Sequence, residues 1–217
     1  MNRVLTKIKQ DNKEFLTSEE LKKYCKDLYF NYRIISNYLI SRGYLINIID
    51  NIYYVKSLDE INKKKLKYSV LELVAKALEN TYVTNWYYGF YTALKLMNIN
   101  YKNQDEFVYL INDKILKNKP IKILGKRFRF LNFKNSFFNF GLINGKIRYS
   151  DLEKTILDFL YLWESNHTNE NRILIELSKL LEEGISEDKI LEYAQYYPKS
   201  NKRILENALN QSKIIIR

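Results

Sequence analysis

The chain has 217 residues, 46% of them hydrophobic and 28% charged, which is the balance of a globular protein with an ordinary buried core. Its apolar runs are far shorter than the roughly 20 residues that span a bilayer, and residues 1–7 lack the apolar stretch of a signal peptide. The 36 Lys and Arg against 25 Asp and Glu give a net charge of +11, which favours polyanionic partners. We therefore expect a cytoplasmic protein that does not contact a membrane. The single cysteine, Cys25, excludes an internal disulfide and is expected to be a small buried residue.

Residues 1–60 predict a short helix, two further helices and a small β-hairpin, in that order. Thr17 and Glu20 have the spacing of a capping box, in which a hydroxyl and a carboxylate each satisfy a free backbone N–H, so the second helix should begin there. The third helix is predicted from about Asn31 to Arg42, and Gly43 follows where a left-handed residue would end it. Two short β-runs within residues 44–55 predict the hairpin. This order is typical of a winged helix-turn-helix, a module that binds duplex DNA.

The third helix should bury one face and present the other. Four apolar residues fit one face of a 3.6-residue period and are predicted to be inward: Ile34, Ile35, Tyr38 and Leu39. Arg can read guanine and Asn can read adenine in the major groove, so the remaining polar residues, Ser41 among them, suit a recognition helix. The candidate DNA-binding residues are Asn31, Tyr32, Arg33, Ser36 and Asn37 on the helix and Asn51, Tyr53 and Lys56 on the wing.

The charge distribution supports a nucleic-acid partner but leaves a second interpretation open. Residues 1–67 hold 14 Lys and Arg against 8 Asp and Glu, a net of +6, while the remaining 150 residues hold 22 against 17, a net of +5. The basic charge is thus expected to be concentrated at the N-terminus, with residues 63–65 near phosphates. Helix-turn-helix folds also serve in protein–protein contacts, and outward Asn and Ser can be a solvated face. The alternative is a protein–protein interaction module without specific DNA binding, for which 19 Tyr and 11 Phe would supply surface.

The rest of the chain predicts an α+β domain, with the boundary placed after residue 60. Two helices, starting near Tyr68 and Trp86, are separated by a strand or extended segment at 81–84. Aromatic and β-branched runs at 107–111, 121–124, 127–133 and 145–149 predict one antiparallel sheet. A second capping box, Ser150 with Glu153, should open a helix, and three more helices are expected at about 171–183, 186–195 and 201–212. The fold class predicted is α+β: a winged helix-turn-helix at 1–60, then a domain at 61–217 with an antiparallel sheet and C-terminal helices.

Three stretches behind the first domain share the pattern of a known family. They are an aromatic-Gly-x-x-Thr-Ala-Leu segment within Tyr87–Leu94, the end of a hairpin at Lys126–Phe130, and a helix start at Tyr149–Asp158. In this order, behind a winged helix, they resemble the AbiEi family of abortive-infection antitoxins over nearly the whole chain. The most specific piece is Glu-Lys-Thr-Ile-Leu-Asp at 153–158.

The resemblance implies a transcriptional regulator that represses its own operon and belongs to a type IV toxin–antitoxin system. The N-terminal winged helix-turn-helix would bind the operator, and the second domain would oppose a cognate toxin that looks like a nucleotidyltransferase. One winged helix reads few base pairs, so inverted repeats bound by two copies would be the expected geometry. The partners implied are double-stranded DNA and a toxin.

The sequence does not predict an enzyme. His167 is the only histidine. The sequence therefore shows no pattern of a catalytic nucleophile with a histidine base and no cluster of zinc ligands. We expect no catalytic residue, no metal and no cofactor. The alternative from the enzyme class is a metal-dependent nuclease with an unrecognised site, although Asp113 lacks the Glu-x-Lys partner that such a site uses. Glu153, Thr155 and Asp158 are expected to cap or hydrogen-bond their helix rather than to catalyse.

Overall fold

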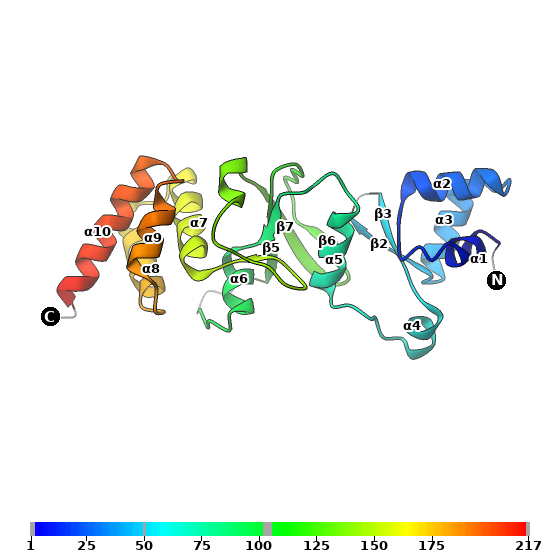
Figure 1. Ribbon diagram of the computed structural model, residues 1–217, viewed down its shortest axis with the longest axis horizontal. Coiled ribbons are helices and arrows are strands. Elements are labelled where there is room, and N and C mark those ends of the chain that lie inside the picture. Colours follow the sequence, from blue (N-terminus) through cyan, green and yellow to red (C-terminus); the bar gives the residue numbers. More distant parts are fainter. Residues whose placement is uncertain (1–2, 50, 102–105, 216–217) are drawn as a thin grey trace. The chain divides into compact units, whose positions relative to one another are not determined.

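The computed structural model describes residues 3–49, 51–101 and 106–215 and shows a mixed α+β protein (Figure 1). The chain divides into two compact units. The first holds Met1–Thr84 and Lys122–Lys126, and the second holds Asn85–Ile121 and Arg127–Arg217. The boundary predicted at residue 60 falls inside α4 (Leu58–Lys63), a helix of the first unit.

The first unit combines helices with a three-stranded antiparallel sheet of order β1-β3-β2. Its helices are α1 (Arg3–Gln10), α2 (Ser18–Asp27), α3 (Tyr32–Ser41), α4 and α5 (Val70–Glu79), and its strands are β1 (Phe15–Thr17), β2 (Leu45–Ile49) and β3 (Ile52–Val55). Helix α5 packs against β2 and β3. Strand β1 was not predicted, because three residues are too few to show an alternating pattern.

The local signals at the helix ends are confirmed. The hydroxyl of Thr17 accepts from the backbone N–H of Glu20 at 3.0 Å, and the carboxylate of Glu20 accepts from the N–H of Thr17 at 2.8 Å. Gly43 follows α3 with a φ of +70°, the left-handed conformation that favours glycine. These two signals fix where α2 begins and where α3 ends.

The sheet of the first unit is buried on both faces. Tyr53 and Val55 of β3 lie among the apolar side chains of α1, α2 and α3, and Cys25 is buried in the same cluster, as predicted. Successive side chains of a strand alternate between its faces, so Tyr54 points the other way. Its hydroxyl donates to the carboxylate of Glu60 at 2.7 Å. The sheet therefore ties α4 to the N-terminal helices.

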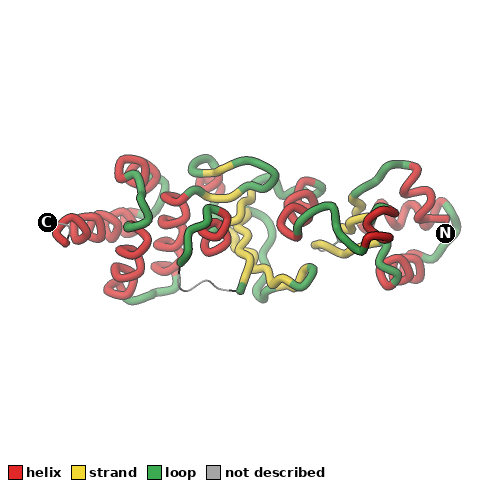
Figure 2. The backbone as a smooth tube through the Cα atoms, turned by 90° about the horizontal axis from the view of Figure 1, so that it is seen from below, coloured by secondary structure: helices red, strands yellow, loops and turns green. Residues whose placement is uncertain are grey.

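The second unit holds most of a six-stranded sheet of order β6-β7-β5-β4-β9-β8, while Lys122–Lys126, with most of β6 and the first residue of β7, belong to the first unit. The strands of this sheet are β4 (Trp86–Tyr88), β5 (Phe107–Asn112), β6 (Ile121–Ile123), β7 (Lys126–Asn132), β8 (Leu142–Ile143) and β9 (Tyr149–Ser150). The helices of the second unit are α6 (Phe90–Leu96), α7 (Leu152–Ser165), α8 (Glu170–Leu181), α9 (Glu187–Ala194) and α10 (Lys199–Ile215), with a 3-10 turn η1 (Asn135–Phe138). Helix α6 packs against β5 and β9, and α7 contacts α6, α8, α9 and α10. In Figure 2 these helices (red) gather beside the strands (yellow).

The prediction of a purely antiparallel sheet was wrong. Strands β5 and β7 are parallel, in register from Phe107 opposite Arg127 to Asn112 opposite Asn132, and β4 pairs with β9 in parallel. Strands β4 and β5 pair antiparallel, as do β8 and β9. The chain after β5 forms β6 at the edge of the sheet, and the turn at Gly125 brings β7 back beside β5. The sheet is therefore mixed.

Three other predicted elements also differ from the structure. The segment from Trp86 was predicted as helix, but its first residues form β4, and the helix begins only after Gly89. The run 145–149 was predicted as a strand, but only Tyr149 of it lies in β9. The segment 81–84 is not a strand, since Thr81 and Tyr82 form a bend and the next two residues lie in a loop. Aromatic residues fill both strands and buried helices, so periodicity over so few residues does not separate the two.

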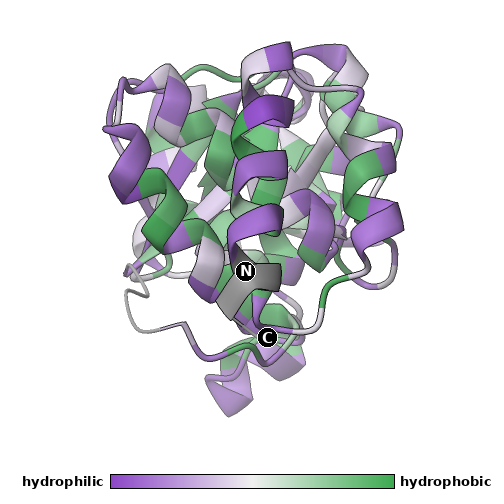
Figure 3. Ribbon diagram, turned by 90° about the vertical axis from the view of Figure 1, so that its left-hand side faces the viewer, coloured by the Kyte–Doolittle hydropathy of each residue, from purple (hydrophilic) through white to green (hydrophobic). Residues whose placement is uncertain are grey.

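The helices are amphipathic rather than uniformly apolar, as the mixture of purple and green along the ribbons shows (Figure 3). Their apolar sides form a large buried cluster in the second unit, which includes Phe90, Phe159 and Leu177. In the part of the chain that the structure describes, no helix has the length and apolar content needed to cross a membrane.

The start of α7 differs from the predicted capping box. Asp151, not Ser150, is the N-cap, and its side chain accepts from the backbone N–H of Lys154 at 2.9 Å. The hydroxyl of Ser150 instead lies 2.7 Å from that of Thr155. Glu153 does not cap α7. Its carboxylate accepts hydrogen bonds from the backbone N–H of Ser186 at 2.9 Å and from Lys189 Nζ at 2.8 Å, so Glu153 joins α7 to α9.

Glu153 should make stability depend on acid. Burial alone would raise the pKa of Glu153, but the hydrogen bonds from Lys189 and Ser186 outweigh it and lower the pKa below the ordinary 4.5. A lowered carboxylate pKa stabilises the fold above the unfolded-state pKa, and this contribution is lost as pH falls below it. We expect Glu153→Gln to be less stable than the wild type at pH 7, with the difference shrinking below pH 4.5. Urea unfolding at several pH values measures this, and a difference that stays constant down to acid pH would contradict it.

A close approach of backbone to α7 requires glycine at position 141. Gly141 has a φ of +61°, and a Cβ there would lie 2.7 Å from Lys154 Cβ and 2.9 Å from a ring carbon of Tyr193. Gly184 has a similar φ of +86° but nothing within 4 Å of its would-be Cβ, which makes it the matched control. We expect Gly184→Ala to cost roughly 1–2 kcal/mol from backbone strain alone and Gly141→Ala to cost clearly more. Equal losses in urea unfolding would mean that the neighbours of Gly141 move aside freely.

Candidate nucleic-acid interface

Helix α3 presents a different face from the one its apolar pattern predicted. Ile35 and Leu39 are buried, as predicted, but Ile34 is 68% exposed and Tyr38 is 40% exposed. Ser36, which was predicted to face outward, is buried instead and is 6% exposed. The outward face therefore carries a polar row of Arg33, Asn37 and Ser41 beside the apolar pair Ile34 and Tyr38.

Three of the predicted contact residues point into the fold. The hydroxyls of Tyr32 and Tyr53 lie 3.2 Å apart and join α3 to β3. Tyr53 is buried, and this burial, together with the hydrogen bond between Tyr53 and Tyr32, raises the pKa of Tyr53 to about 12. The hydroxyl of Ser36 donates to the carbonyl of Arg33 at 3.2 Å. Tyr32, Ser36 and Tyr53 therefore position the helix instead of offering their polar groups to a ligand.

The other predicted residues remain at the surface. Arg33 and Asn37 are exposed on α3. Asn31 is the N-cap of α3, and its side chain accepts from the backbone N–H of Ile34 at 3.2 Å. Asn51 is exposed at the turn between β2 and β3 with a φ of +69°, while Lys56 is half-buried just after β3. The structure thus keeps exposed polar side chains on α3, while Asn51 and Lys56 lie at opposite ends of β3.

Electrostatics of the α3 face suit a polyanion. From Leu28 to Ile49 the sequence contains no Asp or Glu and contains Arg33 and Arg42. The guanidinium carbon of Arg42 lies 6.0 Å from the ring centroid of Tyr38, at the limit of a cation–π contact. A negatively charged ligand on this face would meet no carboxylate of α3 or its flanking turns.

Basic charge is also dense in one segment outside residues 1–67. Residues 107–134 hold 8 Lys and Arg against the single acid Asp113, a net of +7, so the rest of the chain beyond residue 67 has a net charge of −2. On β7 of the second unit the guanidinium carbons of Arg127 and Arg129 lie 4.1 and 4.5 Å from the ring centroid of Phe107. The second unit therefore has an exposed cationic strand of its own.

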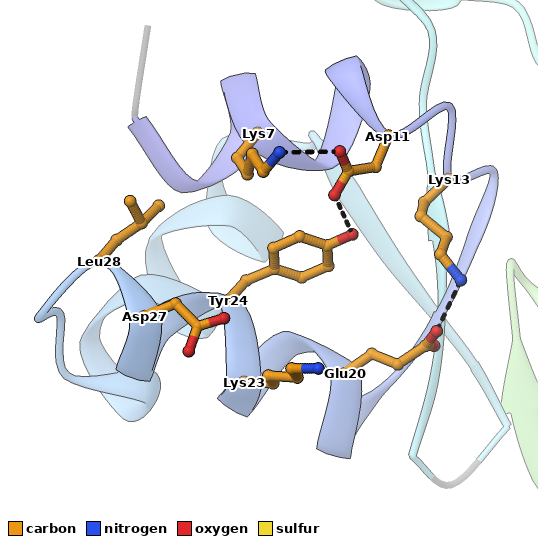
Figure 4. A pocket seen from close by; sticks show the side chains of 8 residues that line it. All are labelled: Lys7, Asp11, Lys13, Glu20, Lys23, Tyr24, Asp27 and Leu28. Atoms are coloured by element: carbon orange, nitrogen blue, oxygen red, sulfur yellow. Dashed lines mark hydrogen bonds and ion pairs between the residues drawn. The ribbon is translucent and has the colours of Figure 1, made fainter.

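A cavity of about 360 Å³ lies between α1 and α2, and its charged walls pair with one another (Figure 4). Lys7 Nζ lies 3.0 Å from Asp11, which also accepts from the hydroxyl of Tyr24 at 2.8 Å. Lys13 Nζ lies 2.8 Å from Glu20. Burial, together with the hydrogen bond to Asp11, raises the pKa of Tyr24 to about 12. These contacts hold α1 on α2 and so support the position of α3 indirectly.

In the second unit, the Glu-Lys-Thr-Ile-Leu-Asp segment at 153–158 contributes to a buried cluster of charged and polar side chains. Lys154 and Asp158 are both fully buried and lie 3.4 Å apart, and Asp158 accepts from the hydroxyls of Tyr87 at 2.8 Å and Tyr197 at 2.6 Å. Thr155 hydrogen-bonds to the carbonyl of Asp151, as expected of a structural residue. With no exposed atom on either member of the ion pair, this cluster stabilises the fold and does not meet a ligand.

Among residues 3–49, 51–101 and 106–215, no group of three or more His, Cys, Asp or Glu side chains could hold a metal ion. His167 is exposed at the end of α7 with a φ of +54°. Asp113, considered above for a nuclease, accepts from the amide of Asn85 at 3.0 Å. The exposed face of α3 carries the predicted contact residues Arg33 and Asn37.

Comparison with known proteins gives a fold likeness. No protein-family model and no curated protein sequence matches the chain. Among solved structures it is similar to the crystal structure of the RV2827C protein from Mycobacterium tuberculosis, with a TM-score of 0.55 and 10% sequence identity. The likeness covers 97% of this chain and 76% of that one. The structural likeness therefore shows a shared fold, which runs from the N-terminal helices to the C-terminal ones.

Proposed function

We propose that this chain is a sequence-specific DNA-binding repressor, with a winged helix-turn-helix in its first unit. In this proposal α2 and α3 are the helix-turn-helix, α3 is the recognition helix, and the β2–β3 hairpin is the wing. The observation that carries it is the outward face of α3, with Arg33, Asn37 and Ser41 in one row and no carboxylate from Leu28 to Ile49. Arg and Asn side chains at such positions form bidentate hydrogen bonds with guanine and adenine in the major groove.

The second part of the proposal is that the protein regulates its own operon as an antitoxin of the AbiEi type. It rests on the resemblance of residues 87–94, 126–130 and 149–158 to that family. A cognate nucleotidyltransferase-like toxin would be the partner of the second unit, and inverted half-sites bound by two copies would form the operator. A repressor acts in the compartment that holds the DNA, so the proposal includes a cytoplasmic location.

A reporter gene fused to the DNA upstream of this coding sequence tests the repressor function. We expect the wild-type protein to lower reporter output and Arg33→Ala combined with Asn37→Ala to restore it. Ile175→Ala, a change at a 57% exposed position on α8, is the matched control and should repress like the wild type. Repression that survives the double substitution would contradict the role given to α3.

Co-expression with the neighbouring gene tests the antitoxin function separately. We expect that gene to arrest growth alone and growth to resume when the full chain is present. If the protein binds a partner chain but no DNA, the alternative of a protein–protein interaction module replaces the repressor. The exposed apolar residues Ile34 and Tyr38 are the observation that favours this alternative.

A further inference from the structure

Three large apolar side chains of α3 are exposed, Ile34, Tyr38 and Ile40, and the first two lie one helical turn apart. Ile34 is 68% exposed and Tyr38 is 40% exposed. They stand four residues apart, so they are neighbours along the helix, as are Arg33 and Asn37 in the row beside them. A β-branched residue lowers helix propensity relative to alanine, and an exposed Ile gains little from burial. The stability of α3 therefore does not explain why an isoleucine stands at position 34.

The charge around this pair identifies the kind of surface it fits. Arg33 shares the outward face, Arg42 follows at the helix end, and no carboxylate occurs from Leu28 to Ile49. A surface that complements it should combine negative charge with small apolar groups. The major groove of DNA has both, because phosphates line it and the C5 methyl of thymine is the apolar group on its floor.

The order of residue types on α3 matches an A·T pair. Asn37 can hydrogen-bond to N7 and N6 of adenine, and the methyl of the paired thymine lies beside these atoms in the same groove. Tyr38 adjoins Asn37 in sequence, and Ile34 lies one turn before Tyr38. The guanidinium carbon of Arg42 lies 6.0 Å from the ring centroid of Tyr38, which places a positive charge near this apolar pair.

We propose that Ile34 and Tyr38 contact thymine methyl groups while Asn37 reads adenine, which gives α3 a preference for A·T pairs in the major groove. This inference rests on the proposed DNA binding. It adds two apolar specificity residues to a site whose polar residues alone would not distinguish thymine from uracil.

Replacing thymine by uracil removes only the methyl group, which makes it the direct test. The tightest duplex is first selected from a random-sequence pool with the full-length wild-type protein, and is then resynthesised with uracil at every thymine. Losing one buried methyl should weaken binding about fourfold, and losing two should weaken it more. In Ile34→Ala and Tyr38→Ala the loss on going from thymine to uracil should shrink, whereas Ile175→Ala on α8 should keep the wild-type ratio. Both positions are exposed on α3, so circular dichroism should show each variant folded like the wild type.

The outcomes separate this inference from the function on which it rests. Equal affinity of the wild type for the thymine and uracil duplexes, with tight binding retained, overturns the inference and leaves DNA binding in place. A wild-type preference that persists unchanged in the double variant Ile34→Ala, Tyr38→Ala also overturns it, because the methyls are then read elsewhere. Failure to bind any duplex at low salt overturns the proposed function and the inference together.

Discussion

Replacing Lys154 by methionine should lower the free energy of unfolding by about 3–5 kcal/mol, the usual cost of removing one member of a buried ion pair. Methionine keeps most of the volume but leaves the carboxylate of Asp158 without its cation. Burial raises the pKa of Asp158 and lowers the pKa of Lys154, while the attraction between the two groups opposes both shifts. The remaining partners of Asp158, the hydroxyls of Tyr87 and Tyr197, are neutral and cannot replace the lost charge.

An exposed pair with the same spacing controls for the loss of a lysine. Lys202 and Glu206 on α10 are also four residues apart, at 3.9 Å, with side chains 51% and 49% exposed. Such surface pairs contribute about 0–1 kcal/mol, so Lys202→Met should change urea unfolding little. The double change Lys154→Met, Asp158→Leu should recover part of the stability, because an apolar pair avoids the desolvation of both charges. A small loss in Lys154→Met alone would mean that Asp158 accepts a proton at no cost.

The second large effect is expected at Arg33. Arg33→Ala should weaken binding to the operator by about 1–3 kcal/mol and relax sequence preference at one position, if its guanidinium reads a base. Its exposure on α3 means that no buried contact is lost. The stability of the protein should therefore be unchanged, and the effect should appear only in titrations with DNA.

Lys56→Ala is the comparison that separates base reading from phosphate contact. The half-buried Lys56 follows β3 near the wing. The Lys56→Ala substitution should weaken binding to all duplexes by the same factor and should reduce the slope of log affinity against log salt by about one unit. If Arg33→Ala instead weakens specific and scrambled duplexes equally, Arg33 contacts phosphate, and the base-reading role would have to pass to Asn37.

Features fixed by neighbouring residues were predictable from the sequence. The capping box of Thr17 and Glu20, the left-handed Gly43 and the hairpin that follows it depend on contacts within a few residues. The structure confirms all three. The same local logic failed at Ser150, because Asp151 next to it competes for the N-cap and Glu153 finds stronger partners on α9.

Features set by distant contacts were not predictable. The apolar residues of α3 come in adjacent pairs, so a 3.6-residue period fits two faces almost equally well. The contact of Tyr32 with Tyr53 and the burial of Ser36 decide between them, and both depend on the sheet. Consequently Ser36 and Tyr53, which were predicted as contact residues, are buried, while Ile34 and Tyr38, which were predicted to be inward, are exposed.

The mixed sheet and the buried lysine were missed for the same reason. Parallel pairing of β5 with β7 depends on β6 taking the edge position, which no local pattern reveals. Lys154 lies on an amphipathic helix, where a lysine is usually solvated. Its ammonium lies near aromatic rings from three separate segments of the chain: Tyr87, Phe137 with Phe140, and Tyr197.

The most direct test of the central proposal, that the α3 face binds a specific DNA sequence, is a fluorescence anisotropy titration at several salt concentrations. The full-length protein is titrated against the duplex upstream of its own coding sequence and against a scrambled duplex of equal length. The proposal predicts saturable binding to the upstream duplex that is at least about a thousandfold tighter than to the scrambled one. Equal, weak and steeply salt-dependent binding to both would contradict it and reduce the basic surface to a nonspecific phosphate-binding patch.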